Sequence, residues 1–267
     1  MVARRHRTAS ISEIGPVRED YGPDWHSVRH HLGITGFGIN VQDADAGQTA
    51  IEGHTEQATG DEELYVVVAG AIELVVDQES VELHEGWAAV VEPVAYRSAT
   101  ALQDGTRVVF VGGRPGAPYQ PPDWDRAGGI DPDHSGDAPR EGAPRAYVAA
   151  DVRTMGSAWS DGPPGWRSVR REMGITSFGT SAVTAAAGET AIDEHDETDS
   201  GHEELYLVAA GSADFLVDGD HFTLAGGDMV VVPPEVSRSA VATADDTLIY
   251  SFGAAPGKPY EMGWGGA

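Results

Sequence analysis

The chain has 267 residues, 40% of them hydrophobic, so it can bury one large core or two of ordinary size. Its formal net charge of -26, with Lys258 as the only lysine, disfavours binding to nucleic acid or to an anionic membrane and favours neutral or cationic partners, including divalent metals. The absence of cysteine excludes disulfides and thiolate ligands, so any metal must be held by His, Asp and Glu. Since no apolar signal region or membrane-spanning stretch is present, we expect a cytoplasmic protein.

An internal repeat organises the sequence. Residues 25–29 (WHSVR) return as residues 166–170 (WRSVR), and the register then runs without a gap to a Pro-Tyr pair at 118–119 and again at 259–260. Matches over this length are typical of gene duplication. The sequence therefore predicts two folding units of the same kind.

The segment between the copies is dense in Pro, Gly and Asp and has neither hydrophobic periodicity nor apolar content, which predicts a surface linker. We divide the chain into an N-terminal domain at 8–119, a linker at 120–145 and a C-terminal domain at 146–262. Residues 10–14 resemble residues 148–152 and are interpreted as the first strand of each unit, with a short insertion before the tryptophan of one copy.

Within each copy the pattern indicates short strands rich in Val, Ile, Tyr and Phe, separated by turns that contain Gly and Asp. No long segment shows the 3.6-residue period of an amphipathic helix. Many short strands with regular turns favour an all-β tandem of sandwiches or barrels. The predicted strands are 64–69, 72–76, 87–91 and 108–111 in the first copy, and 205–210, 213–217, 229–232 and 247–252 in the second.

A segment rich in imidazoles and carboxylates lies directly before the first of these strands in the second copy. If strand alternation extends back past its start, His202, Glu204 and Tyr206 share one face. His202 and Glu204, together with His195 and Glu197, would form a set of His and carboxylate ligands that can hold Fe, Mn, Zn or Ni. The alternative is that His195 and Glu197 are solvent-facing loop residues.

The first copy offers a weaker second site at the equivalent positions, with His54, Glu56, Asp61 and Glu63 as candidate ligands. Asp61 stands where the second copy has a histidine, so this set has one imidazole instead of two. Transition-metal affinity depends strongly on imidazole, which favours a degenerate half that serves an interface or stability.

Two motifs in each copy resemble those of the cupin superfamily. Residues 63–70 and 204–211 each place six residues between a Glu and a Gly, as in the first cupin motif, and residues 227–233 match the Gly and Pro of the second. Residues 86–93 match that second motif with one extra residue. The resemblance covers nearly the whole chain. It implies a bicupin of two tandem double-stranded β-helix barrels, related to jelly rolls, with a small-molecule site in the barrel mouth.

The sequence departs from the family pattern where the second cupin motif supplies its metal-binding histidine, because Arg238 and Arg97 occupy that place. Arginine stays protonated and does not ligate metal. Arg238 could anchor an anionic substrate, with Tyr206 supplying a hydrogen bond as a second catalytic residue. Alternatively, each arginine could form an ion pair with the motif glutamate and replace the metal altogether.

Three functions follow from the resemblance and its departures. The first is a cupin-type small-molecule protein with a divalent metal in the C-terminal barrel, acting on a small anionic substrate as an oxygenase, isomerase, decarboxylase or lyase. The second is a metal-free ligand-binding or sensory bicupin in which Arg97 and Arg238 hold an anion. The third is a structural bicupin with decayed sites. We expect a monomer or homodimer, with no nucleic-acid or membrane partner.

Overall fold

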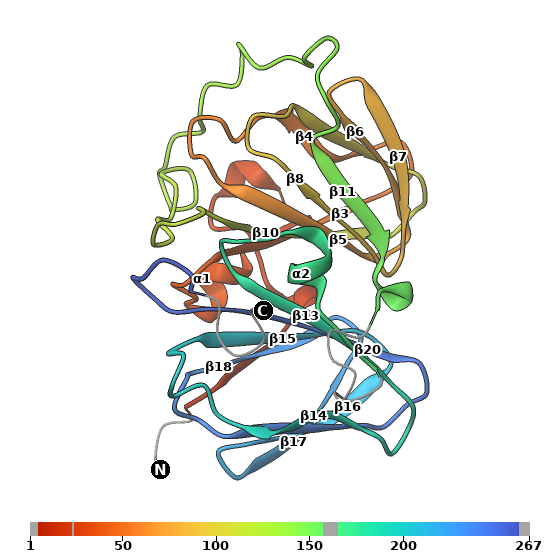
Figure 1. The fold of residues 1–267 in the computed structure, drawn as a ribbon, viewed down its shortest axis with the longest axis vertical. Helices are drawn as coiled ribbons and strands as arrows, with labels where there is room; N and C mark the ends of the chain where they lie inside the picture. Colours follow the sequence, from red (N-terminus) through yellow and green to blue (C-terminus); the bar gives the residue numbers. More distant parts are fainter. Residues whose placement is uncertain (1–4, 23, 157–164, 262–267) are drawn as a thin grey trace.

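Two antiparallel β-barrels stack along the long axis of the molecule (Figure 1). The computed structural model describes residues 5–22, 24–156 and 165–261. Each barrel consists of a six-stranded sheet and a four-stranded sheet, and each is named here for the repeat that supplies most of its strands. The predicted all-β architecture of two tandem barrels is confirmed.

The N-terminal barrel has the sheet orders β11-β8-β5-β10-β3-β2 and β4-β9-β6-β7. The first repeat also contains the short helix α1 (Val28–Leu32) and two 3-10 turns at Ile11–Glu13 and Glu19–Tyr21. Its strands are β2 (Trp25–His26), β3 (Gly38–Ala44), β4 (Thr49–His54), β5 (Glu62–Ala69), β6 (Ala71–Val76), β7 (Glu79–His84), β8 (Trp87–Val91), β9 (Arg97–Ala101) and β10 (Thr106–Gly113).

The C-terminal barrel repeats this topology with the sheet orders β1-β18-β15-β20-β13-β12 and β14-β19-β16-β17. The second repeat contains the helix α2 (Val169–Met173) and a 3-10 turn at Val152–Thr154. Its strands are β12 (Trp166–Arg167), β13 (Gly179–Ala185), β14 (Thr190–His195), β15 (Glu203–Ala210), β16 (Ser212–Val217), β17 (Asp220–Ala225), β18 (Asp228–Val232), β19 (Arg238–Ala242) and β20 (Thr247–Ala254).

Local sequence explains the turns that bound β16. Asp218 and Gly219 both have positive φ, as a two-residue hairpin loop requires, and they join β16 to β17. Gly211, which ends the first motif, has φ +71, and a Cβ placed there would lie 2.8 Å from the Cα of Thr247. Only glycine fits this position, because both the conformation and the close approach exclude a side chain.

The first strand of each repeat lies in the sheet of the other barrel. β1 (Arg7–Ser10) pairs with β18, and β11 (Tyr147–Asp151) pairs with β8 (Figure 1). Each six-stranded sheet is therefore completed by a strand from the opposite repeat. Hydrogen bonds of the sheet ladders thus cross between the repeats in both directions.

These two strands also correct the predicted alignment of the repeats at their start. Ser10 lies opposite Asp228, and Asp151 lies opposite Trp87. Since Trp87 and Asp228 are equivalent positions, Ser10 corresponds to Asp151 and not to Val148 as the sequence match suggested. The register therefore holds from the first strand onward, and the predicted insertion before the tryptophan is absent.

The two six-stranded sheets face one another across the largest apolar cluster, which contains residues of both barrels. Two acidic residues add polar contacts across this interface. A carboxylate oxygen of Glu203, on β15, accepts hydrogen bonds from the backbone N–H groups of Thr35 at 2.6 Å and Gly36 at 2.5 Å. Glu62, on β5, makes the equivalent pair of bonds to the second repeat.

Residues 120–145 contain no helix or strand, and they run along the outside of the N-terminal barrel as the yellow-green trace in Figure 1. Polar side chains fix this segment at several points along its length. The pairs are Asp125 with Arg29, Asp131 with Arg18, Asp137 with Thr55, and Arg140 with Asp77. The linker is therefore folded onto the first repeat over its whole course.

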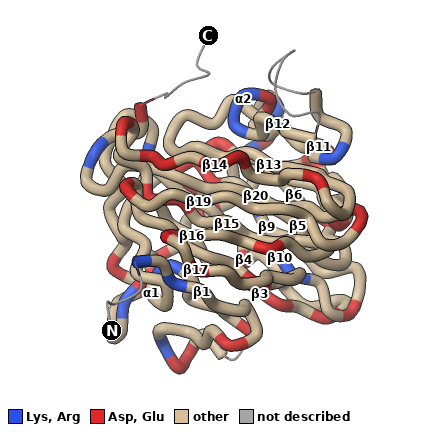
Figure 2. Tube along the Cα trace, turned by 90° about the horizontal axis from the view of Figure 1, so that it is seen from below, with Lys and Arg blue, Asp and Glu red and all other residues tan. Residues whose placement is uncertain are grey.

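Acidic residues are spread over both barrels with few basic residues between them (Figure 2). The net charge of -26 is thus a property of the whole surface rather than of one patch. Within the described residues, neither short helix approaches the length or apolar character needed to cross a membrane.

Candidate functional site

In the C-terminal barrel, three side chains place ligand atoms within 4.8 Å of one another: His195, Glu197 and Glu204. His195 ends β14, Glu197 follows in the next loop, and Glu204 lies on β15. Strand alternation directs Glu204 and Tyr206 to the same side of β15. The Tyr206 hydroxyl accordingly donates a hydrogen bond to the Glu204 carboxylate. Three of the four predicted ligands of this copy thus come together.

The orientation of His195 suits a metal ligand. Its Nδ1 lies 2.7 Å from the backbone carbonyl of Asp193, and because a carbonyl only accepts, Nδ1 carries the proton. Its Nε2 faces Glu204 Oε2 at 3.6 Å and Glu197 Oε1 at 3.9 Å. A hydrogen bond that fixes one ring nitrogen and turns the other towards neighbouring carboxylates is usual for histidines that bind metal.

The fourth predicted ligand, His202, lies outside this cluster. β15 begins at Glu203, so the strand alternation that would have aligned His202 with Glu204 does not extend back to it. Its ring stacks instead on Tyr260, with ring centroids 5.4 Å apart. Burial lowers the pKa of His202, so this imidazole is neutral at pH 7.

The N-terminal barrel contains the same arrangement at equivalent positions. His54, Glu56 and Glu63 also place ligand atoms within 4.8 Å of one another. The Nδ1 of His54 donates to the carbonyl of Glu52 at 2.7 Å, and its Nε2 lies 3.3 Å from Glu63 Oε2. Asp61 forms an ion pair with Arg114 at 3.4 Å and does not join the group. Both barrels therefore present one imidazole and two carboxylates.

A fully buried arginine lies at each cluster. Arg238 and Arg97 have 0% exposure and are the largest fully buried side chains of the described residues. Each donates one hydrogen bond from Nη2 to a backbone carbonyl, of Pro233 at 3.1 Å and of Glu92 at 2.9 Å. In both arginines, Nε and Nη1 have no hydrogen-bond partner. Buried donors of this kind are costly unless an acceptor reaches them, so they mark a place for one.

The predicted ion pair between arginine and the motif glutamate exists in the second copy, as a long contact. Arg238 Nε lies 3.8 Å from Glu204 Oε2, which is beyond hydrogen-bond distance. The charge of Arg238 therefore stabilises the carboxylate without satisfying the guanidinium.

The ionisable groups of the N-terminal cluster shift one another's pKa values. Burial, followed by repulsion from Glu63, raises the pKa of Glu56 to about 7. Burial also disfavours the charged form of Glu63, but the hydrogen bond from His54 and the nearby positive charges outweigh it and lower its pKa to about 2. The hydrogen bond to Glu63 in turn outweighs burial and raises the pKa of His54. Glu56 is thus held partly protonated, and a cation bound beside it would favour its ionised form.

In the C-terminal cluster, the pKa values of the histidine and of the motif glutamate shift in the same directions as in the N-terminal one. The hydrogen bond to Glu204 raises the pKa of His195. Burial opposes ionisation of Glu204, but His195, Arg238 and Tyr206 together outweigh it and lower its pKa. The carboxylate is therefore ionised at neutral pH in both barrels.

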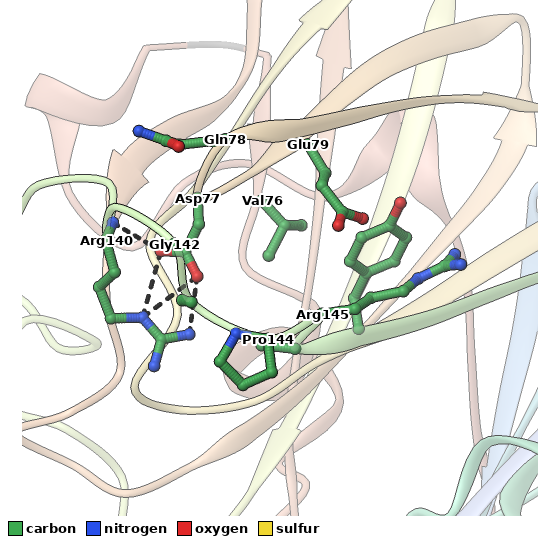
Figure 3. A pocket seen from close by; sticks show the side chains of 11 residues that line it. Val76, Asp77, Gln78, Glu79, Arg140, Gly142, Pro144 and Arg145 are labelled. Atoms are coloured by element: carbon green, nitrogen blue, oxygen red, sulfur yellow. Dashed lines mark hydrogen bonds and ion pairs between the residues drawn. The ribbon is translucent and has the colours of Figure 1, made fainter.

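A pocket of about 190 Å³ lies elsewhere, between the β6–β7 turn and residues 140–147. Figure 3 shows Asp77 and Arg140 joined by hydrogen bonds at one side of it and the Arg145 side chain extending away. None of its lining residues belongs to either His/Glu cluster. It is the space that the linker leaves where it crosses the hairpin, and we assign no chemistry to it.

One residue near the N-terminal cluster was not predicted from the sequence. His134, in the linker, lies against His54 with ring centroids 5.5 Å apart and planes at 60°. The linker has no counterpart in the repeat, so neither the internal alignment nor a motif could single out this histidine. Its proximity to His54 depends entirely on how the linker folds.

No protein-family model matches the sequence, and no curated protein matches it. Solved structures do match. The YlbA protein of Escherichia coli aligns with a TM-score of 0.62 at 14% identity, over 97% of this chain and 93% of that one. An oxalate decarboxylase variant of Bacillus subtilis aligns with a TM-score of 0.62 at 13% identity, over 99% and 80%.

The bacterial pirin YhhW of Escherichia coli, in complex with nickel(II), aligns with a TM-score of 0.60 at 14% identity, over 94% of this chain and 99% of that one. At this level of identity, the similarity concerns the fold. The matched structures extend over both barrels and the linker. The chain therefore has the fold of a bicupin, two tandem barrels of the cupin type.

Proposed function

We propose that the chain binds a divalent metal ion at the His/Glu/Glu clusters and holds a small anionic ligand beside it with the buried arginine. The observation that supports this most directly is the pairing of the two features in each barrel. A cluster of three potential ligands lies next to a guanidinium that has two unpartnered donors. Folding alone requires neither feature, because burying charged groups and unpartnered donors is costly.

The residues fit a divalent ion in type and in charge. One imidazole and two carboxylates are ligands that Mn, Fe, Zn and Ni accept. Metal binding requires deprotonated ligands, here a neutral imidazole and two carboxylates. With the protonated arginine and a divalent ion, the formal charge of the occupied site is one positive, which a monoanionic ligand neutralises.

Each side chain then has a definite task. The carbonyl of Asp193 orients His195, and the hydroxyl of Tyr206 holds Glu204 in place. Arg238 donates charge-assisted hydrogen bonds from Nε and Nη1 to the anionic end of the ligand. A bound divalent ion would supply Lewis-acid polarisation or O2 activation at an open position.

Two of the matched structures support a metal at this fold. Oxalate decarboxylase of Bacillus subtilis has Mn(II) centres, and the pirin structure contains nickel(II). At 14% identity to both, this similarity supports a divalent ion in barrels of this fold.

Elemental analysis of protein loaded in turn with Mn2+, Co2+, Zn2+ and Ni2+ tests the metal. We expect stoichiometric metal in the wild type, loss of the C-terminal equivalent in His195→Ala and Glu204→Gln, and no loss in His221→Ala, an exposed histidine on β17. A protein that retains no stoichiometric metal under any of these conditions would refute the proposal.

The anion is tested with oxalate and formate as probes, by calorimetric titration of metal-loaded protein. Arg238→Met should abolish binding at the C-terminal barrel while metal content stays unchanged, and Arg238→Lys should recover part of the affinity. Unchanged affinity for the probes in a folded Arg238→Met protein would show that this arginine does not bind the anion.

A second candidate, a metal-free anion-binding module, is favoured by one observation. Glu204 already has positive or hydrogen-bonding neighbours in His195, Tyr206 and Arg238. In that case the probes would bind to chelator-treated protein as tightly as to the metal-loaded form. The two candidates are therefore separated by the same titrations.

A further inference from the structure

We infer that His134 is an additional metal ligand of the N-terminal site, supplied by the linker, and that this makes the N-terminal site the tighter of the two. The inference rests on the proposed function, since it concerns the same clusters. It reverses the expectation from the sequence, in which the N-terminal copy was the weaker site because it had a single imidazole.

The separation of the two rings suits a shared ion. A metal-bound imidazole nitrogen lies about 2.0–2.1 Å from the ion, and the ring centre lies about 1.1 Å beyond it. Two imidazoles at roughly 90–120° around one ion therefore have ring centres roughly 4.5–5.5 Å apart. The centroids of His54 and His134 are 5.5 Å apart, and their planes make an angle of 60°, which is a mutual tilt rather than a stack. His134 stands just outside the group of ligand atoms that lie within 4.8 Å of one another, so its ring must move towards the cluster to complete the site.

The hydrogen bonding of His134 leaves the correct nitrogen for a metal. Its Nδ1 lies 2.8 Å from an oxygen of the Asp137 carboxylate, so Nε2 remains as the potential ligand atom. Carboxylate–histidine pairs of this kind orient imidazoles toward bound metals. The same Asp137 oxygen accepts from the backbone N–H of Thr55 at 2.8 Å and from its hydroxyl at 3.0 Å.

That contact ties the linker directly to the metal-site segment, because Thr55 lies between His54 and Glu56. The linker is fixed on both sides of His134 as well. Asp131 binds Arg18 at 2.8 Å, and Arg140 binds Asp77 at 2.7 Å. A ligand held between two anchors loses little further entropy on binding.

Within the described residues, no segment covers the C-terminal site as the linker covers the N-terminal one. His195 has 37% of its side chain exposed, against 18% for His54. Asp196 stands where the first copy has Thr55, and its carboxylate accepts a hydrogen bond from the backbone of Thr198. A second carboxylate such as Asp137 would be repelled there. The exchange of Thr for Asp thus distinguishes the covered site from the open one.

Titration with Co2+, followed by visible absorption and equilibrium dialysis, tests the inference in two single-site backgrounds. His195→Ala leaves the N-terminal site, and His54→Ala leaves the C-terminal one. Adding His134→Ala should weaken Co2+ binding at least tenfold in the His195→Ala background and leave it unchanged in the His54→Ala background. The matched control is His84→Ala, an exposed histidine of the same barrel.

A ligand role is separated from a merely structural one by His134→Cys. The chain has no other cysteine, so a cobalt–thiolate charge-transfer band in the near ultraviolet can arise only from that position. We expect the band in the His195→Ala background. Its absence, together with unchanged affinity in His134→Ala, would overturn the inference.

Failure of the proposed function gives a different result. If the wild-type protein binds no stoichiometric Co2+, both proposals are wrong. If Co2+ binds at the N-terminal site with equal affinity with and without His134, the metal site stands and only the role of the linker is wrong.

Discussion

Removing the carboxylate of Glu203 should destabilise the contact between the two barrels. This side chain is buried, and one of its oxygens accepts the N–H groups of both Thr35 and Gly36 at 2.5–2.6 Å. A hydrogen bond to a charged acceptor contributes about 1.5–3 kcal/mol, and the Thr35 bond is partly exposed. Glu203→Ala should therefore lower the free energy of unfolding by about 2–4 kcal/mol. Glu203→Gln keeps a neutral acceptor and should cost about half as much.

Urea unfolding, followed by circular dichroism and tryptophan fluorescence, measures these changes. Glu62→Ala should give a loss of similar size, because Glu62 makes the equivalent bonds from the other barrel. Glu52→Ala, at an exposed position on β4, is the matched control and should stay within about 0.5 kcal/mol of the wild type. A loss below that limit in Glu203→Ala would refute the assigned role of this carboxylate.

Three further predictions concern backbone, pH and metal. Gly211→Ala should lower the free energy of unfolding in urea by about 2–4 kcal/mol, because the alanine would combine positive φ with overpacking against Thr247. A smaller loss than in Gly257→Ala, at an exposed glycine of positive φ, would contradict this. Burial opposes ionisation of Asp43, but bonds from Arg107 and His26 outweigh it and lower its pKa to about 2, below the unfolded value. Its stabilisation is therefore present above pH 4 and lost as the pH falls towards 2, and Asp43→Asn should flatten the acid limb of the stability profile. Mn2+ at a hundredfold excess over its Kd should raise the free energy of unfolding by about 2.7 kcal/mol per site, and thermal melts indistinguishable from those of chelated protein would contradict that.

The repeat and the strand pattern were sufficient to predict the architecture. The strands carry their own signals in alternating burial and in glycines of positive φ at the turns, as at Gly211 and Gly219. The exchange of β1 and β11 between barrels carried no such signal. A strand at a sheet edge has the same residue pattern whichever sheet it joins, because the path of the chain in space determines its partner.

The candidate site was predictable in part for a related reason. His195, Glu197 and Glu204 lie on or beside neighbouring strands, so local spacing was enough to bring them together. His202 was placed by extending strand alternation one residue beyond the true start of β15, where it no longer applies. His134 required knowledge of the tertiary path of the linker, which composition alone describes only as irregular.

The exchanged strands bear on how such a chain could have arisen. A protein made of one repeat would leave the edge of its larger sheet open, since the strand that covers this edge comes from the other repeat. Two copies of that protein could each donate a strand to the other and close both edges at once, as in a domain-swapped homodimer. Joining the copies through residues 120–145 would make this association permanent. It would also allow the two halves to diverge, so that the linker covers only one of the two barrels. In an exactly symmetric homodimer, both barrels would carry the same cover or neither would.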